Sequence, residues 1–375
     1  MTIFLFILLA IFILMVMITI HELGHYLVGK WLGFRINEFS IGFGKAIFKR
    51  QSKKTGEIFA IRMIPLGGYC MFSGEDNSGG AGTGFGAEPS QEEFPNRKGQ
   101  YFDKQPPWKR LCVLFSGGFF NFIFAILFCF ILIMSVGYHQ EVRVHAVRPE
   151  ADGIYAGDRI TAINGERFRI LNGWNVVINQ YNVGDEITLT LYRAGQRMYV
   201  PVEIQEFTVD GRQVAGIGFA RASAERIAPG FWEAIGQSFM LTFRLAWLML
   251  VILWHLITGR LSLNDAGGPI ATISVMASVS ANNLMDILIL LPLISVNLAV
   301  FNLLPIPALD GAKMVFVGIE WIRGKPVNPE IEGRIHIIGL VILLGLVLLL
   351  DINFLFNSLG NVGRAIIGMT GRFRL

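Results

Sequence analysis

Two histidines and a glutamate end a long apolar run near the start of the chain. They form the pattern His21-Glu22-Leu23-Gly24-His25, and residues 3–20 before it carry no charge. Residues four positions apart share one face of a helix, so both imidazoles can reach a single tetrahedral Zn²⁺. Glu22 stands beside them, where it can accept a proton from a water molecule. The pattern predicts a hydrolytic zinc centre. The plainer alternative is a helix end whose polar side chains reach toward water.

A catalytic zinc site needs a third protein ligand and one open position. Asp310 is the strongest candidate, because it follows 23 residues, 287–309, that carry no charge. Asp351 has a similar setting, but polar residues follow it and it falls at the outer end of its span. The lone His255 and His336 are better explained as packed or interfacial side chains. We therefore expect His21, His25 and Asp310 to hold one Zn²⁺ per chain, with Glu22 as the catalytic base.

The residues just before Asp310 favour a wet cavity. Pro305 and Pro307 remove backbone donors and break the helix. Irregular backbone at membrane depth is tolerated only inside protein or beside water. Asn297 and Asn302 are predicted to hold a substrate backbone or an oxyanion, and hydrogen bonding between helices is the alternative for both.

The composition indicates that these residues belong to a membrane protein. The 375 residues are 53% apolar and 16% charged, whereas soluble domains carry about 25% charged residues. Four spanning helices are predicted, at 1–29, 110–136, 284–311 and 335–356. A cleaved signal peptide is the alternative for the first helix.

A fifth apolar run is too short to span a membrane. Residues 245–254 are only ten apolar residues, and they lie between Arg244 and His255. A span needs about 20 residues. This run therefore predicts an interfacial or re-entrant helix within the segment 208–283.

The basic residues predict which side each loop faces. Thirteen Lys and Arg lie from Lys30 to Arg110, which places the loop 30–109 in the cytoplasm. Part of that loop, 73–100, is rich in Gly and predicts a flexible insert. The remaining loops alternate: the N-terminus, 137–207 and the tail 357–375 are extracytoplasmic, and 312–334 is cytoplasmic.

This sidedness agrees with the choice of Asp310. If the third span enters from outside, Asp310 ends at the inner side of the membrane, at the depth of His21 and His25. A crossing by residues 236–258 would instead place Asp310 on the opposite side. The agreement requires that 236–258 do not cross.

The region 137–207 alternates apolar and polar residues as strands do. Predicted strands cover 142–147, 159–163, 186–192 and 198–204, with a turn at Asn164-Gly165. The order resembles a PDZ domain, a class that binds extended chain ends by adding a strand to a sheet. A small β domain with a purely structural role is the alternative.

These motifs together resemble the site-2 protease family of intramembrane zinc metalloproteases, in its bacterial branch with a single PDZ domain. The resemblance covers almost the whole chain. The matching motifs are His21 to His25, Gly42-Phe43-Gly44, Pro65-Leu66-Gly67-Gly68-Tyr69, Phe102-Asp103-Lys104-Gln105-Pro106, Ser116-Gly117-Gly118 with Asn121, Gly267-Gly268-Pro269, and Asn302 to Gly311. Gly118 stands where relatives commonly carry Pro.

The resemblance implies a reaction and its partners. The family cleaves within or beside the transmembrane helix of single-span proteins, usually after another protease has trimmed their outer part. Trimmed anti-sigma factors and leftover signal peptides fit this class. The PDZ region is implied to act as a size filter, and the location is the bacterial inner membrane, in contact with lipid.

The resemblance also implies a substrate-binding segment. Residues 62–72 resemble a membrane-associated β-hairpin that receives unwound substrate as an added strand. The residues predicted to bind substrate there are Ile64, Pro65, Leu66, Gly67, Gly68 and Tyr69.

The predicted fold class is an α-helical polytopic membrane protein with an inserted extracytoplasmic β-rich PDZ domain and a cytoplasmic-side β-hairpin. A non-catalytic PDZ-containing scaffold with a vestigial metal site is the main alternative. A metal transporter needs a file of ligands across the bilayer, and the sequence offers one cluster. No basic patch is interleaved with aromatic residues, so nucleic acid is excluded as a partner.

Overall fold

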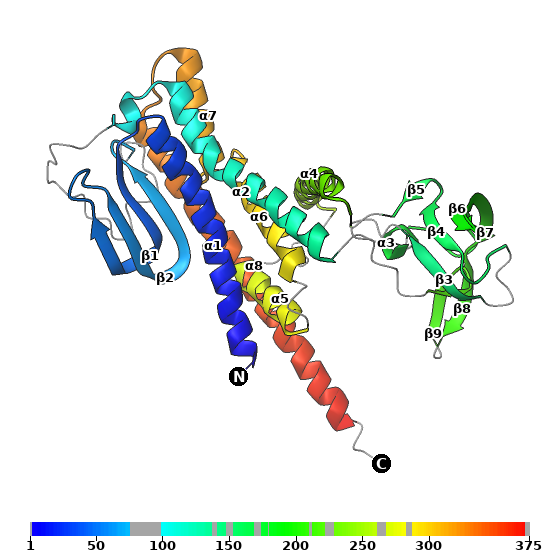
Figure 1. The fold of residues 1–375 in the computed structure, drawn as a ribbon. Helices are drawn as coiled ribbons and strands as arrows, with labels where there is room; N and C mark the ends of the chain where they lie inside the picture. The colour runs from blue at the N-terminus through cyan, green and yellow to red at the C-terminus, as the bar shows by residue number, and fades with distance from the viewer. Residues whose placement is uncertain are drawn as a thin grey trace. The chain divides into compact units, whose positions relative to one another are not determined.

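The computed structural model describes residues 2–75, 99–136, 141–147, 153–168, 174–178, 180–209, 212–221, 229–260, 268–282 and 287–371. The chain divides into two compact units (Figure 1). The larger unit combines Met1–Phe128 with Thr242–Leu375, and the smaller unit is Cys129–Leu241. The predicted insert at 73–100 lies outside the described residues except at its two ends.

Among the described residues, four helices are long and apolar enough to cross a membrane. They are α1 (Thr2–Trp31), α2 (Pro107–Val136), α4 (Phe231–Ile257) and α8 (Pro329–Gly371), each with a spanning-type stretch of 27 to 29 residues. At 1.5 Å per residue, such stretches exceed the roughly 30 Å of a bilayer's hydrocarbon core. The prediction of a helical membrane protein with four such helices is confirmed at this level.

The identity of the third such helix differs from the prediction. The apolar run around 245–254 belongs to the 27-residue helix α4, so its interpretation as a short helix is wrong in length. Arg244 and His255 lie inside α4 and do not end it, because a long basic side chain can extend away from an apolar helix surface. The predicted span 284–311 contains α6 (Ile287–Leu303), which has only 17 residues.

The core of the larger unit lies where α1 meets two shorter helices. Met17 and Ile20 of α1 are buried against Met276 of α5 (Pro269–Asn282) and Ile294 of α6. The turn after α6 leads into α7 (Asp310–Arg323). Helix α8 begins six residues before the predicted span at 335 and continues to Gly371.

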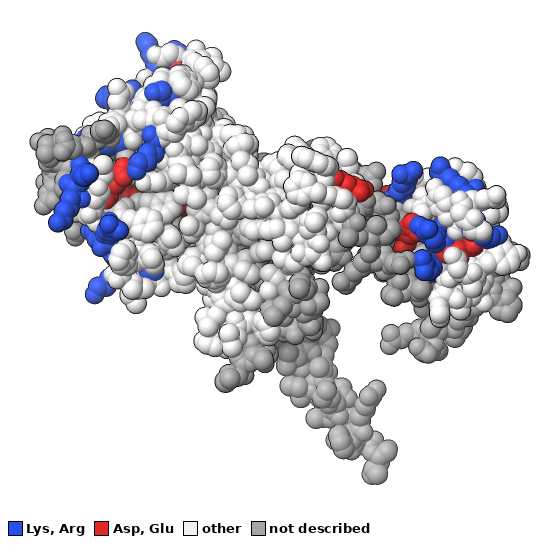
Figure 2. All heavy atoms as spheres, in the orientation of Figure 1, with Lys and Arg blue, Asp and Glu red and all other residues white. Residues whose placement is uncertain are grey.

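A long antiparallel hairpin follows α1. It consists of β1 (Ile36–Gln51) and β2 (Ile58–Phe72), and β2 packs against α1 (Figure 1). Phe72 lies in an apolar cluster with Phe102 of the 3₁₀ helix η2 (Phe102–Lys104). Figure 2 shows Lys and Arg gathered over the hairpin, beside an almost uncharged helical surface. The exposed basic residues of its outer half are Lys45, Lys49, Arg50, Lys53 and Lys54.

The smaller unit contains a β domain. Its main sheet has the order β10-β3-β4-β6-β7, and β5 pairs with β4. The strands are β3 (Val142–Val147), β4 (Arg159–Ile163), β5 (Glu166–Arg167), β6 (Glu186–Arg193), β7 (Gln196–Glu203) and β10 (Phe219–Arg221). A short helix, α3 (Trp174–Ile178), and a separate hairpin, β8 (Gln205–Val209) with β9 (Arg212–Gly216), complete the domain.

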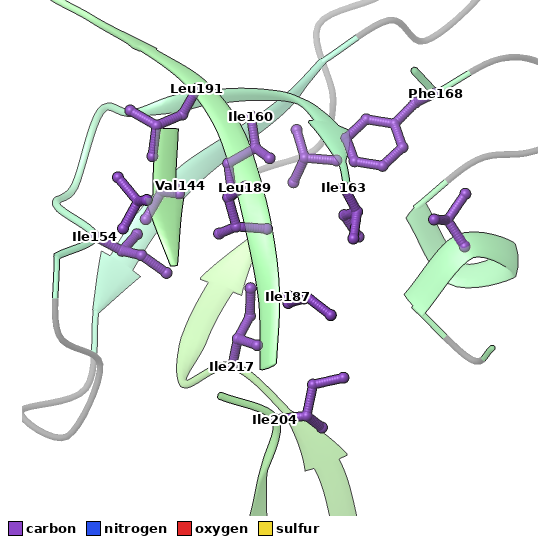
Figure 3. Packing of buried hydrophobic residues seen from close by; sticks show 13 residues of the cluster. Val144, Ile154, Ile160, Ile163, Phe168, Ile187, Leu189, Leu191, Ile204 and Ile217 are labelled. Atoms are coloured by element: carbon purple, nitrogen blue, oxygen red, sulfur yellow. The ribbon is translucent and has the colours of Figure 1, made fainter. Parts of the chain in front are cut away.

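The alternation of strand residues produces a single apolar core in this domain. Ile187, Leu189 and Leu191 of β6 point to one face and are buried against Ile160 and Val144 (Figure 3). Trp174 of α3 packs at the edge of the same cluster. The four predicted strands are present, and the sheet gains β10 from residues beyond 207.

Candidate metal centre

Two imidazoles and one carboxylate converge in the larger unit. His21 and His25 lie one turn apart on α1, and Asp310 is the first residue of α7. Asp310 Oδ2 is 3.0 Å from His21 Nε2 and 3.2 Å from His25 Nε2. The two Nε2 atoms are 3.2 Å apart, and their rings are nearly perpendicular, at 85°. The structure thus brings together the three residues that the sequence singled out.

The turn between α6 and α7 positions Asp310 next to the two histidines. Helix α6 ends at Leu303, and Pro305 and Pro307 follow in a segment without regular structure. Leu309 is extended, and α7 starts immediately after it. A carboxylate in the first turn of a helix also interacts favourably with the helix dipole.

The donor set fits a metal cation. The described residues contain one group of three His, Cys, Asp or Glu whose ligand atoms lie within 4.8 Å of one another, and it is this one. Two imidazoles and a carboxylate are typical zinc ligands. His25 donates its Nδ1 proton to the Val113 carbonyl, 2.8 Å away, so in the neutral ring Nε2 presents a lone pair toward His21. Two lone pairs that face each other at this distance repel, whereas a cation between them attracts both.

Helix α2 supports the histidines from behind. The Val113 carbonyl that orients His25 also accepts a hydrogen bond from Ser116 Oγ, at 2.6 Å. Such outer contacts fix the orientation of a metal-binding imidazole. A Cβ added to Gly117 would lie 2.4 Å from His25 Nε2 and 2.6 Å from His21 Cε1. Only glycine lets α2 pass this close, and α2 stays a continuous helix here.

Glu22 lies at a pocket of about 230 Å³ beside the cluster. His25 and Asp310 line the same pocket, together with the β2 backbone at Gly68 and Cys70. Gly68 of β2 lies directly beside Glu22, since a Cβ added to this glycine would be 3.4 Å from Glu22 Cγ. The arrangement holds a carboxylate next to the convergent ligand atoms and leaves space for a substrate carbonyl and water.

The predicted substrate-binding residues occupy different places. Gly68 and Tyr69 line the pocket, whereas Ile64 and Pro65 are exposed on the hairpin. Gly67 packs against the ring of Phe43, and the side chain of Leu66 lies outside the described residues.

The two asparagines of α6 stand apart from the pocket. Asn297 is exposed, Asn302 is half-buried, and neither lines the pocket. Their roles toward substrate stay predictions.

A partly buried ion pair beside the centre was not anticipated. Lys313 Nζ is 2.7 Å from Glu75 Oε1, and both residues line the pocket. Burial opposes the charge on Lys313, but the nearby carboxylates of Glu75 and Asp310 outweigh it and raise the pKa of Lys313. The position of Lys313 three residues after Asp310, on the same helix face, was the available signal.

His336 also belongs to this neighbourhood. It is buried on α8, as the sequence reading of a packed histidine expected, and it lines the pocket. Its Nδ1 accepts a hydrogen bond of 3.0 Å from the Ala308 N–H. Nothing in the sequence connects these two residues, which are 28 positions apart.

The fold and the site together define a metallopeptidase with helices of membrane-spanning character. Residues 9–346 match the model of Peptidase family M50, and the chain belongs to that family. The resemblance to site-2 proteases, and with it the prediction of a peptidase, is confirmed at the level of the family.

Several known proteins are similar to this chain. A predicted zinc metalloprotease of Rhizobium meliloti is 30% identical over 369 residues, which cover 92% of this chain and 96% of that protein. Zinc metalloprotease RasP of Geobacillus kaustophilus is 26% identical over 391 residues, with coverage of 86% and 91%. Among solved structures, the PDZ domain of an SdrC-like protein from Listeria monocytogenes is 26% identical. It covers 22% of this chain and 88% of that domain, with a TM-score of 0.20.

Proposed function

We propose that the chain is a zinc-dependent intramembrane endopeptidase acting on single-span membrane proteins. The convergence of His21, His25 and Asp310 beside Glu22 carries this proposal. The three ligands would hold one Zn²⁺ per chain. When bound, the ion polarises a peptide carbonyl and makes water more acidic. Similar proteins carry the name zinc metalloprotease, which supports this choice of metal.

The protein's own residues transfer the proton and bind the substrate. Glu22 accepts a proton from the attacking water and later donates it to the leaving amine. The bond that breaks is the C–N bond of the scissile peptide, and the new C–O bond comes from water. The pocket between Glu22 and the backbone of Gly68–Cys70 gives room for an extended chain. An intact helix keeps its carbonyls in hydrogen bonds, so the substrate must unwind before attack.

Strand β2 is the proposed partner for the unwound substrate. Within the described residues, the segment 68–72 of β2 pairs with residues 36–41 of β1 along one edge, and this segment lines the pocket. A substrate segment added to the other edge would place its carbonyls near Glu22. Backbone hydrogen bonds of this kind bind many sequences, which suits a peptidase with several single-span substrates.

The contacts within the larger unit support a topology. His21 lies in the C-terminal half of α1, Asp310 follows the C-terminal end of α6, and their side chains are 3.0 Å apart, so both helices run toward the same side. The start of α2 is at that end as well, because Gly117 touches the histidines. The chain from the end of α2 to the start of α6 therefore makes no net crossing, whatever the length of α4. With the basic loop after α1 inside, the centre lies near the cytoplasmic side of the bacterial inner membrane.

The β domain would then be extracytoplasmic, and we assign it the role of a filter. Substrates trimmed by another protease, such as an anti-sigma factor or a leftover signal peptide, would pass, and those with a large outer domain would not. The domain's compactness as a separate unit supports this role.

The deciding experiment uses purified protein in detergent and a panel of single-span substrates, with and without a trimmed outer part. Wild type, Glu22→Gln and Glu330→Gln are compared with and without a zinc chelator, and bound zinc is quantified. Glu330 is exposed at the start of α8, so Glu330→Gln is the matched control. We expect cleavage by wild type and the control, and none by Glu22→Gln or after chelation.

Two results would contradict the proposal. Cleavage that survives in Glu22→Gln would exclude this carboxylate as the base. Protein that binds zinc but cleaves no member of the panel would favour the non-catalytic scaffold.

A further inference from the structure

In the turn 304–309, which precedes Asp310, every backbone N–H but one donates a hydrogen bond to a carbonyl in or next to the turn. The N–H groups of Leu304, Ile306 and Leu309 donate to carbonyls of residues 301–306. Pro305 and Pro307 have no N–H to place. The Ala308 N–H alone leaves the turn, and it donates to Nδ1 of His336 at 3.0 Å. The contact is partly buried, and an N–H shielded from water without a partner is disfavoured, so this hydrogen bond helps to hold the turn in its shape.

Ala308 also adopts an uncommon backbone conformation. Its φ is +78°, in the left-handed region that side chains other than glycine rarely occupy. Such a conformation persists only where neighbouring contacts hold it. Ala308 is two residues from Asp310, so a change in its dihedral angles re-aims the carboxylate.

Helix α8 holds the turn at two adjacent positions on one face. His336 contacts Ala308, and Gly339, three residues later, faces Pro307. A Cβ added to Gly339 would lie 2.1 Å from Pro307 Cβ. The imidazole of His336 is fixed in turn by packing, since it is only 3% exposed and its ring lies 5.6 Å from that of Phe316 on α7.

We infer that His336 is a positioning residue for the metal centre. By accepting the Ala308 N–H, it holds the turn 304–309 in the conformation that presents Asp310 to His21 and His25. The inference rests on the proposed function, because it assigns His336 a role in assembling that zinc site. The hydrogen bond of His336 goes to the Ala308 backbone and to none of the three ligands, so His336 acts through the backbone.

Three substitutions separate this role from bulk packing. Asn has an oxygen near the position of Nδ1, so His336→Asn keeps the acceptor. His336→Gln carries its amide one bond further, and His336→Leu has no acceptor. We expect zinc binding by the chelator-stripped protein to weaken about tenfold or more in the Leu and Gln variants, as for lost outer-shell contacts. His336→Asn should stay within about threefold of wild type.

A fourth variant tests the strain at Ala308. Glycine occupies φ near +78° without penalty. Ala308→Gly in the His336→Leu background should therefore recover most of the lost zinc affinity. His145→Leu, at an exposed position of the β domain, is the control and should bind zinc as wild type does.

The measurements are a zinc titration against a chromophoric chelator and amide hydrogen exchange of the peptide containing Ala308. Exchange is followed in metal-free protein, so it reports on the turn even if wild type binds no zinc. Faster exchange in His336→Leu than in His336→Asn supports the inference. A folded His336→Leu variant with wild-type exchange and wild-type zinc affinity overturns it, and so does equal impairment of the Asn and Leu variants. A wild type without zinc would count against the proposed function alone.

Discussion

Asp310 Oδ2 lies 3.0 Å from Nε2 of His21, although 289 positions separate the two residues in the chain. The contact joins the start of α7 to α1. It is the long-range contact on which the candidate metal centre depends, because the two histidines are local neighbours on one helix.

Replacing Asp310 by Asn tests this contact directly. Asn keeps the size of the side chain but removes the charge that complements a cation. Loss of a ligand should weaken zinc binding by more than the 10–100-fold typical of outer contacts, and cleavage should disappear. Bound zinc and cleavage are measured on the same preparation, with Asp103→Asn as the control. Normal zinc content with full activity in Asp310→Asn would refute the ligand assignment.

Gly117→Ala should damage the centre through sterics alone. The new methyl group would stand 2.4 Å from His25 Nε2, so either α2 or the imidazole must move. We expect zinc affinity to fall about tenfold or more, with the helical content unchanged. Gly345→Ala provides the control, since a Cβ there meets nothing within 4 Å. Equal zinc affinity in both variants would show that α2 does not approach the histidines this closely.

The β domain should lose stability in acid through one buried carboxylate. Burial of Asp158 opposes its ionisation, but hydrogen bonds from Arg193 and from the Tyr155 N–H outweigh burial and lower the pKa of Asp158. Its contribution to stability is therefore present above the ordinary pKa near 3.8 and is lost as pH falls through the lower value of the folded state.

Hydrogen exchange of β4 and β6 at pH 7 and pH 3, corrected for the intrinsic rate, measures this loss. Asp158→Asn should be less protected at pH 7 and should show a smaller change toward pH 3 than wild type. Glu186→Gln, at an exposed position, should behave as wild type. An unchanged acid response in Asp158→Asn would assign the effect to other groups.

Removal of the β domain should change substrate choice and spare the chemistry. A deletion of residues 142–205 would remove β3 but keep β10, which pairs with β3. The strand β10 would then have no partner. A deletion of 142–221 is the better design. We expect the shortened protein to cleave untrimmed substrates that wild type rejects, at a rate within about threefold for trimmed ones. Loss of all cleavage in a folded deletion protein would contradict the filter.

The parts of the site that depend on residue spacing and local charge could be predicted from the sequence. Helical periodicity alone places His21 and His25 on one face, and the charge of Asp310 stands out after a long apolar run. The strands of the β domain followed from their alternation of apolar and polar residues.

Other features depend on contacts that no local rule describes. The length of α4 was underestimated because the charged residue Arg244, which lies inside the helix, was interpreted as the end of the apolar run. The pairing of β10 with β3 joins segments about 70 positions apart, and three-residue strands carry little pattern of their own. The Ala308–His336 contact links a backbone N–H to a side chain on another helix, so side-chain patterns cannot reveal it.

The distance in sequence between the two halves of the metal centre has a consequence during synthesis. A nascent chain that has grown only to Leu303 already contains α1, α2 and both histidines, but it lacks the third ligand. The set of three ligand candidates is therefore complete only after α1, α2 and α6 have been made. The order of residues along the chain thus delays completion of the candidate metal centre until residue 310 has been synthesised.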